Sequence, residues 1–246
     1  MPPIYTKQFH ILTSQTDAFR RLKPSHLLAF VQEVAGDHSG LLGTGREELA
    51  KRSLFWAVLR HRVQITRLPE AGEDITVETW PMPTTRTAFP RSAVAYDRNG
   101  KELFRSISLW VLMDTDQRGM VLPGKSGVQV EGLLRGSELA VPGSLAVRTM
   151  QNQQRRQVRF SDLDCNGHMN NCRYLDWVAD TLPGSFHSAH SPREFSVRYS
   201  SEARENETLE LSWELTQEGC LTVDAHRETP DTQSEHSRVF SVQMQF

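Results

Sequence analysis

The sequence predicts an α+β protein built from two copies of one unit, in each of which a curved antiparallel sheet wraps around a single helix. Three observations lead to this fold class: an amphipathic helical stripe that occurs twice, a strand pattern that follows each stripe, and a glycine- and proline-rich connector between the halves. A chain of 246 residues is longer than a typical single core, which fits two fused units.

The helical stripe first lies in Pro24–Gly36, where apolar residues at i, i+1, i+4, i+7 and i+8 share one helix face. The segment Asn171–Leu182 repeats this stripe 147 positions later (174 − 27 = 147). Three glycines are expected to end the first helix, and they are Gly40, Gly43 and Gly45. The two stripes consist of Leu27, Leu28, Val31, Val34 and Ala35, and of Tyr174, Leu175, Val178, Thr181 and Leu182. The two helices are therefore predicted to be copies of each other.

Downstream of each helix the apolar period changes from about 3.6 to about 2, which predicts strands. The first two strands of the second half follow those of the first at a common shift of 134 (197 − 63 and 209 − 75). The predicted strands are Arg62–Ile65, Asp74–Thr79, Ala93–Tyr96 and Ser106–Met113, and then Ser196–Tyr199, Leu209–Trp213, Leu221–His226 and Val239–Phe246. The segment Asp97–Gly100 predicts a hairpin. Each half is thus a strand, a helix and an antiparallel meander.

The connector lies between Leu122 and Met150, and its density of turn residues is typical of a linker. These residues are Pro123, Gly124, Gly127, Gly132, Gly136, Pro142 and Gly143. We therefore predict an N-terminal domain at 1–121, a linker at 122–150 and a C-terminal domain at 151–246.

Composition and charge narrow the class of function. The 28 basic and 30 acidic residues nearly balance, which argues against a general nucleic-acid binder and against a cationic membrane-surface protein. No basic and apolar leader and no membrane-spanning run is found, so we expect a soluble cytoplasmic protein. Three cysteines without a C-x-x-C pair support neither a disulfide framework nor a zinc ribbon. We expect no cofactor and no metal.

The segment Phe160–Asn171 gathers reactive side chains just before the second helix. Asp164 can act as a base or nucleophile, His168 can transfer a proton near neutral pH, and a helix start offers N–H groups to an oxyanion. Asp17 lies at the position equivalent to Asp164 in the first copy. The residues equivalent to Asn166 and His168 there are Phe19 and Arg21. A turn aspartate, an Asn-Gly turn and an asparagine N-cap explain these residues separately but not the combination.

The pattern Ser161-Asp162-Leu163-Asp164-x-Asn166-x-His168-x-Asn170-Asn171-x-x-Tyr174 resembles the signature of the acyl-acyl-carrier-protein (acyl-ACP) thioesterases of plastids and bacteria. Segments of the first half resemble that family in the same order, namely Leu41–Gly43, Leu54–Val58 and Ser108–Met113. The resemblance implies a tandem double hotdog fold. It also implies hydrolysis of fatty acyl-ACP in fatty acid biosynthesis, with acyl carrier protein as partner.

The resemblance also adds a fourth site residue. Tyr199-Ser200-Ser201-Glu202-Ala203 is similar to the family's tyrosine-x-x-glutamate-cysteine pattern, which implies Glu202 alongside Asp164, Asn166 and His168 as catalytic residues. Alanine stands at position 203, where plant members often have cysteine, and this argues against a cysteine nucleophile. A mechanism through Cys165 or Cys172 would need one of them beside His168.

These residues lead to an expected mechanism. The carboxylate of Asp164 either activates a water or attacks the thioester carbonyl, and the sequence does not choose between the two. Asn166 and His168 orient the carboxylate and polarise the thioester, Glu202 positions water, and N–H groups near Asn170 hold the oxyanion. By resemblance, the first unit supplies an acyl tunnel. The segments expected to contribute to it are Leu27–Leu42 and Phe55–Val58. The basic clusters Arg20–Lys23 and Arg155–Arg156 are candidates for docking an acidic carrier, and a homodimer is possible.

Other signals point elsewhere but lack support. Gly119–Ser126 satisfies the phosphate-loop pattern, yet no helical stripe follows it. His187 and His190 are expected in solvated loops, without zinc-ligand spacing, and no G-x-S-x-G elbow is found. Two alternatives stay open: an acyl-CoA thioesterase of the 4-hydroxybenzoyl-CoA hotdog type, and a non-catalytic acyl-binding or dehydratase-like hotdog protein. Acyl-chain length and saturation preference are left undetermined.

Overall fold

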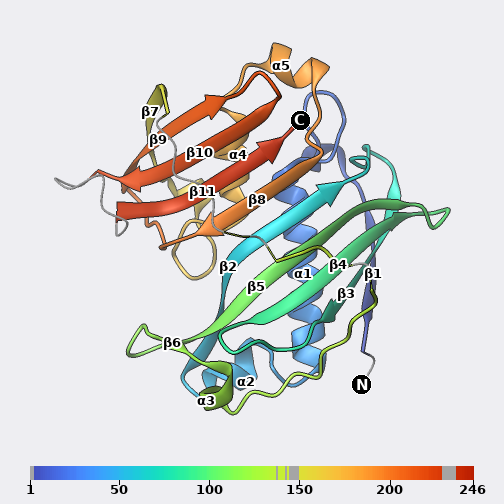
Figure 1. Ribbon diagram of the computed structural model, residues 1–246, viewed down its shortest axis with the longest axis vertical. Coiled ribbons are helices and arrows are strands. Elements are labelled where there is room, and N and C mark those ends of the chain that lie inside the picture. The colour runs from blue at the N-terminus through green and yellow to red at the C-terminus, as the bar shows by residue number, and fades with distance from the viewer. Residues whose placement is uncertain (1–2, 137, 142, 144–149, 229–236) are drawn as a thin grey trace. The chain divides into compact units, whose positions relative to one another are not determined.

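A computed structural model describes residues 3–136, 138–141, 143, 150–228 and 237–246 of the chain (Figure 1). It divides into two compact units, Met1–Pro142 and Gly143–Phe246. The division falls inside the segment 122–150 that was predicted as a linker. The two units are described one after the other.

The N-terminal unit contains a five-stranded antiparallel sheet with a short sixth strand. Its strands are β1 (Tyr5–His10), β2 (Leu54–Ile65), β3 (Asp74–Pro81), β4 (Phe89–Asp97), β5 (Glu102–Asp114) and β6 (Met120–Val121). Their order is β1-β3-β4-β5-β2, and β6 pairs with β5. The meander therefore comprises β3 to β5, whereas β2 crosses to the far side of β5. The predicted hairpin at Asp97 is confirmed, since Gly100 N–H donates to the Asp97 carbonyl at 3.0 Å.

Helix α1 (Pro24–Leu41) lies against one face of this sheet and buries its apolar stripe (Figure 1). The helix extends beyond the predicted stripe, through Gly36 and Gly40 to Leu41, and it ends within the glycine-rich segment that was predicted to end it. It stops where Gly43 adopts a left-handed conformation with φ of +70°. Glycine tolerates this conformation at little steric cost, and the Gly43 N–H donates to the Gly40 carbonyl at 3.1 Å. A short helix α2 (Arg46–Ala50) follows.

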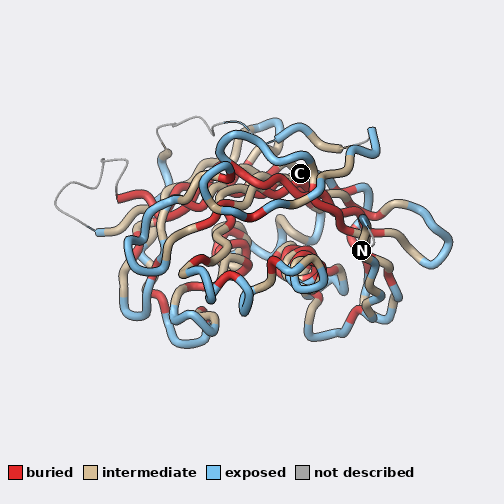
Figure 2. The backbone as a smooth tube through the Cα atoms, turned by 90° about the horizontal axis from the view of Figure 1, so that it is seen from below, coloured by how far each residue is buried: buried red, intermediate tan, exposed pale blue. Residues whose placement is uncertain are grey.

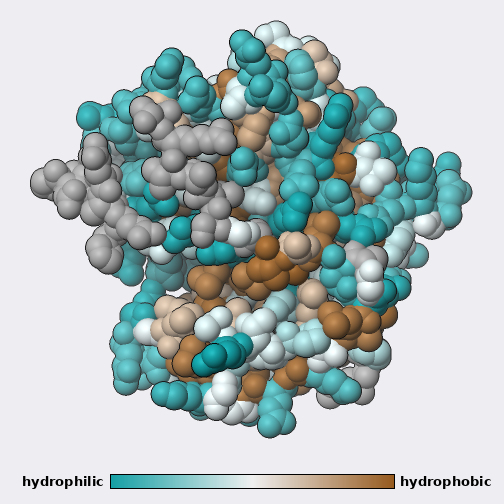
Figure 3. Space-filling view, in the orientation of Figure 1, coloured by the Kyte–Doolittle hydropathy of each residue, from teal (hydrophilic) through white to brown (hydrophobic). Residues whose placement is uncertain are grey.

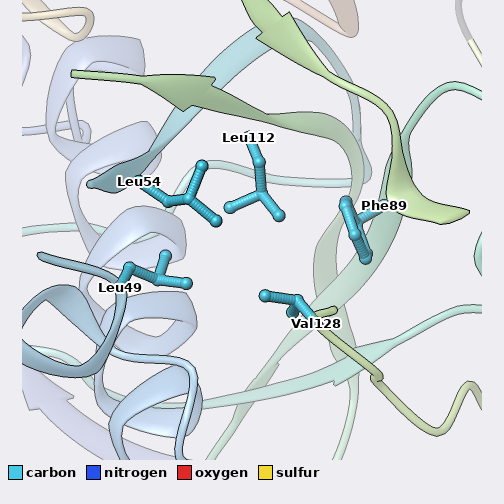
Figure 4. Close-up of a cluster of buried hydrophobic side chains, with 5 residues drawn as sticks. All are labelled: Leu49, Leu54, Phe89, Leu112 and Val128. Atoms are coloured by element: carbon cyan, nitrogen blue, oxygen red, sulfur yellow. The ribbon is translucent and has the colours of Figure 1, made fainter. Parts of the chain in front are cut away.

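Buried apolar side chains pack together in the part of the N-terminal unit near α2. Five buried residues form one cluster (Figure 4), and they are Leu49, Leu54, Phe89, Leu112 and Val128. Val128 belongs to the segment predicted as a linker, so this part of the segment packs on the N-terminal unit. Gly132 continues the contact: a Cβ there would lie 2.2 Å from the Pro83 backbone nitrogen, so only glycine fits.

The phosphate-loop pattern at Gly119–Ser126 has the wrong surroundings for a nucleotide site, as predicted. Helix α3 (Pro123–Ser126) contains the lysine and serine and ends at Gly127, whose φ is +67°. No helix begins in 127–132. A phosphate loop needs a helix that begins at this lysine and points its N–H groups at the phosphates.

The C-terminal unit repeats the topology of the first. Its strands are β7 (Asn152–Gln157), β8 (Glu194–Tyr199), β9 (Thr208–Leu215), β10 (Cys220–Arg227) and β11 (Arg238–Gln245). Their order is β8-β11-β10-β9-β7. Read from β7, this is the N-terminal order β1-β3-β4-β5-β2, with β7, β9, β10, β11 and β8 as the respective counterparts. The α+β tandem double hotdog fold is confirmed. Figure 2 shows that buried residues concentrate in the strands and in the helices that cover them.

Helix α4 (Arg173–Ala179) is shorter than the predicted Asn171–Leu182. Asn171 and Cys172 form a turn instead of a first helical turn, and the helix ends before Pro183 because proline disfavours helical geometry in the residue before it. A helix that was not predicted, α5 (Gly184–Ala189), follows. His187 therefore lies in a helix and His190 at its C-cap, contrary to the expected solvated loops.

No helix in the described part of the chain is both long and apolar enough to cross a bilayer. Most of the face seen in Figure 3 is hydrophilic, with apolar side chains gathered in smaller patches.

Candidate active site in the C-terminal unit

Asp164 organises the loop that precedes α4. Its Oδ1 accepts the N–H of Asn166 at 2.8 Å and that of His168 at 3.4 Å, while its own N–H donates to the His168 carbonyl at 2.8 Å. Gly167 allows the reversal with φ of +76°. The Asn166 side-chain amide lies 3.4 Å from Asp164 Oδ2. The loop thus commits one carboxylate oxygen to backbone N–H groups and leaves the other beside an amide.

Glu202 joins this loop from a distant part of the sequence, 34 positions after His168 (202 − 168 = 34). Met169 N–H donates to the Ala203 carbonyl at 2.8 Å, and His168 forms a β-bridge with Arg204. These contacts place the His168 Nε2 atom 3.2 Å from Glu202 Oε2. The side chains are 18% and 39% exposed, so both can be reached from solvent. The four predicted site residues therefore lie together.

The N–H groups near Asn170 are mostly occupied by the fold. Asn170 N–H donates to the Asp162 carbonyl at 2.8 Å, Cys172 N–H to Asn170 Oδ1 at 2.8 Å, and Arg173 N–H to the Asn170 carbonyl at 2.9 Å. Among the residues that the structure describes, Asn171 N–H has no acceptor. It is the remaining candidate in this segment for binding an oxyanion.

The same loop occurs in the N-terminal unit around Asp17. Asp17 Oδ1 accepts the N–H of Phe19 at 2.8 Å and that of Arg21 at 2.9 Å, and Asp17 N–H donates to the Arg21 carbonyl at 2.8 Å. Arg20 takes the left-handed position of Gly167 with φ of +67°. The aspartate is thus part of the loop architecture in both units, and its presence alone does not identify a catalytic site.

The side chains around the loop distinguish the two units. In the N-terminal unit Arg21 replaces His168 and pairs with Asp17 at 2.8 Å. Leu68 stands in the place of Glu202 (202 − 68 = 134) and is buried. Only the C-terminal copy therefore combines a carboxylate, an amide, an imidazole and a second carboxylate.

Cys172 is poorly suited to nucleophilic catalysis. Cys172 is buried, and burial raises the pKa of its thiol to about 12, with a smaller contribution from the Asp176 charge. A thiol with this pKa stays protonated at neutral pH and is a weak nucleophile. Cys165 is exposed, and position 203 is a buried alanine. Among the described residues no group of three or more His, Cys, Asp and Glu side chains could hold a metal ion.

Three arginines of the basic clusters considered for carrier docking make intramolecular ion pairs. Arg155 pairs with Glu228 at 2.7 Å, and Arg156 pairs with Asp180 at 2.6 Å and stacks over the Trp177 ring. Arg21 pairs with Asp17 as described. These surface pairs are weak enough to exchange with an acidic partner, so the docking role stays a prediction.

One side chain that contacts the site was not predicted. Arg227, at the end of β10, donates a hydrogen bond from Nη2 to the Glu202 carbonyl oxygen. It lies 25 positions after Glu202 (227 − 202 = 25). No local sequence motif predicts which strands pair with the strand that contains it. The alternation of β10 marks the strand but gives no signal for this contact.

Two family models match the chain in succession: the acyl-ACP thioesterase N-terminal domain over residues 2–122, and the acyl-ACP thioesterase C-terminal domain over residues 146–241. The chloroplastic dodecanoyl-[acyl-carrier-protein] hydrolase of Cinnamomum camphora is 28% identical over 225 residues, which cover 84% of this chain and 58% of that relative. The chloroplastic palmitoyl-acyl carrier protein thioesterase of Arabidopsis thaliana is 25% identical, with coverage of 88% and 56%. The chain thus spans somewhat more than half the length of these curated relatives.

A solved structure agrees with the fold. The crystal structure of an acyl-ACP thioesterase from Bacteroides thetaiotaomicron superposes with a TM-score of 0.89 at 23% identity, covering 99% of this chain and 98% of that one. The two family models occur here in the order N-terminal then C-terminal, one on each hotdog unit, and together they cover most of the sequence. The chain therefore belongs to the acyl-ACP thioesterase family.

Proposed function

We propose that this protein hydrolyses the thioester bond of fatty acyl-ACP and releases a free fatty acid in fatty acid biosynthesis. The observation that carries the proposal is the asymmetry between two copies of one loop. Asp164, Asn166, His168 and Glu202 lie together in the C-terminal unit, whereas the N-terminal copy keeps only the aspartate. Family membership and the names of the curated relatives support the substrate class.

Thioester chemistry suits this set of side chains. The thiol formed on cleavage has a pKa of about 8.5, so the thiolate can leave without being protonated by a strong acid. The enzyme therefore mainly needs a nucleophile and an oxyanion site. Asp164 Oδ2 is the candidate base or nucleophile, because Oδ1 is held by two N–H groups. As a general base it contributes roughly 10²–10⁴-fold to the rate. In the general-base route Asp164 takes a proton from water, the water oxygen bonds to the carbonyl carbon, and the C–S bond breaks. The carrier then leaves as the thiolate and the acyl group is released as the fatty acid.

The other residues position the reactants. Glu202 Oε2 lies 3.2 Å from His168 Nε2 and orients the imidazole through this contact. His168 and Asn166 polarise the thioester and orient the Asp164 carboxylate, and Glu202 also helps to position water. Asn171 N–H is the candidate oxyanion donor, and a single such donor is worth about 3–4 kcal/mol in other hydrolases.

The N-terminal unit binds the acyl chain in this proposal. It has Phe19, Arg21 and Leu68 in place of the reactive side chains, so it has no comparable chemistry. A dehydratase-like role is not favoured by any contact described above. A cytoplasmic location and a homodimer stay predictions.

The decisive experiment offers acyl-ACP of medium to long chain length beside the matching acyl-CoA esters and records free thiol. We expect release from acyl-ACP in the wild type and faster turnover than with acyl-CoA at equal concentration. Release from neither substrate would contradict the hydrolase assignment. A strong preference for acyl-CoA would contradict the carrier-protein part and favour the acyl-CoA thioesterase alternative. Acyl-chain binding without thiol release would favour the non-catalytic alternative.

A further inference from the structure

The loop between β8 and β9 carries Glu202 and is tied to β10 by one guanidinium group. Arg227 donates from Nη2 to the Glu202 carbonyl, from Nη1 to Ser201 Oγ at 2.7 Å, and from Nε to Glu207 at 3.2 Å. Ser201 Oγ in turn donates to the Arg238 carbonyl at 2.9 Å. The backbone of Glu202 is therefore anchored to the strands next to it.

The N-terminal unit holds the equivalent carbonyl in the same manner. Arg67 donates to the Leu68 carbonyl at 3.3 Å and pairs with Glu73 at 2.6 Å and 2.8 Å. Leu68 and Glu73 correspond to Glu202 and Glu207 (202 − 68 and 207 − 73 are both 134). A guanidinium thus binds this carbonyl and an acidic side chain five residues further along in both units.

The two arginines come from different positions, Arg67 from the loop after β2 and Arg227 from the end of β10. Arg67 corresponds to Ser201 (201 − 67 = 134), which lies on the loop itself. Arg227 pairs with Leu209 across the sheet as Asp97 pairs with Ile75, so Arg227 takes the position of Asp97 in the first unit. Because the same contact is built twice from different positions, it reflects a requirement of the loop and not an accident of one side chain.

We propose that Arg227 is a positioning residue for the hydrolase, a role that rests on the function proposed above. The Glu202 carboxylate is 39% exposed, so packing alone does not fix it. Its place 3.2 Å from His168 Nε2 depends on the backbone that carries it, and Arg227 holds that backbone. Arg227 acts through Glu202 and His168.

The expected effect is on turnover more than on substrate binding. A displacement of a catalytic group by about 1 Å can cost about 10²-fold in rate. Arg227→Gln removes the charge and the forked geometry, and should lower kcat by about 10- to 100-fold with little change in KM. Arg227→Lys keeps a point charge for Glu207 but not the fork that also binds the Glu202 carbonyl and Ser201, so it should recover part of kcat.

Arg67→Gln is the matched control, because it breaks the equivalent contact in the unit without the reactive side chains. We expect its kcat to stay close to that of the wild type. In a Glu202→Gln background, Arg227→Gln should cause little further loss, since the residue through which it acts is already altered. Full additivity of the two changes, or a wild-type kcat for a folded Arg227→Gln variant, would overturn the proposal.

A second measurement does not depend on turnover. The ring-nitrogen signals of His168 in an isotope-labelled NMR spectrum report its contact with Glu202. These signals should shift in Arg227→Lys and stay unchanged in Arg67→Lys. Unchanged His168 signals in Arg227→Lys would overturn the proposal, even if Arg227→Gln failed to fold. A wild-type protein that releases no thiol would contradict the function itself, whereas active wild type with unaffected Arg227 variants would contradict only the positioning role.

Discussion

Replacing Asp164 and Asp17 by asparagine, one at a time, separates catalysis from loop stability. Asparagine keeps one side-chain oxygen, so it can still accept the two N–H groups that each aspartate binds. It removes the negative charge in both places. The two loops have matching hydrogen bonds, and each substitution is therefore the control for the other.

The structure predicts opposite rankings for stability and activity. In Asp164→Asn the side-chain contact at risk is the weak one to the Asn166 amide at 3.4 Å, so the free energy of unfolding should change by no more than about 0.5 kcal/mol. In Asp17→Asn the ion pair with Arg21 is lost. These side chains are 29% and 19% exposed, and after solvent screening the loss is about 1 kcal/mol.

Activity should follow the reverse order. Asp164→Asn removes the proposed base or nucleophile, so kcat should fall by about 10²–10⁴-fold, which corresponds to about 3–5 kcal/mol of transition-state stabilisation. Asp17→Asn should retain wild-type turnover of acyl-ACP. Urea unfolding and thiol release, measured on the same preparations, test both rankings. Wild-type turnover by a folded Asp164→Asn variant would refute the catalytic assignment, and equal losses in both variants would show that the aspartates act only through the loop.

Two further predictions concern buried titratable groups. Burial raises the pKa of Cys172 to about 12, so a thiol reagent at pH 8 should modify Cys165 and spare Cys172. The Cys172→Ser variant should keep wild-type turnover. Rapid labelling of Cys172 with loss of activity would instead support a cysteine mechanism. Burial lowers the pKa of His61 to about 3, so below pH 6.5 the unfolded chain binds a proton that the folded chain excludes, and stability falls as the pH falls. His61 alone should lower the free energy of unfolding by about 2 kcal/mol between pH 6.5 and pH 5. In His61→Phe the free energy of unfolding, measured with urea, should fall less steeply as the pH falls. The same pH dependence in His61→Phe and wild type would contradict the lowered pKa of His61.

Local sequence patterns were sufficient to predict the elements that depend on neighbouring residues in the chain. The apolar stripe of α1 and the first part of its repeat, Tyr174, Leu175 and Val178 in α4, follow from helical periodicity, and the hairpin at Asp97 follows from turn chemistry. Helix ends were harder to predict. Gly36 and Gly40 lie inside α1 because neither needs a left-handed conformation, whereas Gly43 does. Composition alone does not distinguish these glycines, since the conformation of each depends on what the following residues contact.

By itself, the sequence determined the duplication, the α+β class and the candidate residues Asp164, Asn166 and His168, because each of these is encoded by spacing within one segment or between two similar segments. The hotdog fold was implied by the family resemblance. Glu202 entered only through a family pattern. The tertiary structure decided that Glu202 meets His168 and that Arg227 anchors the loop. These contacts join residues far apart in the chain through strand pairing, and the choice of strand neighbours depends on the whole packed sheet.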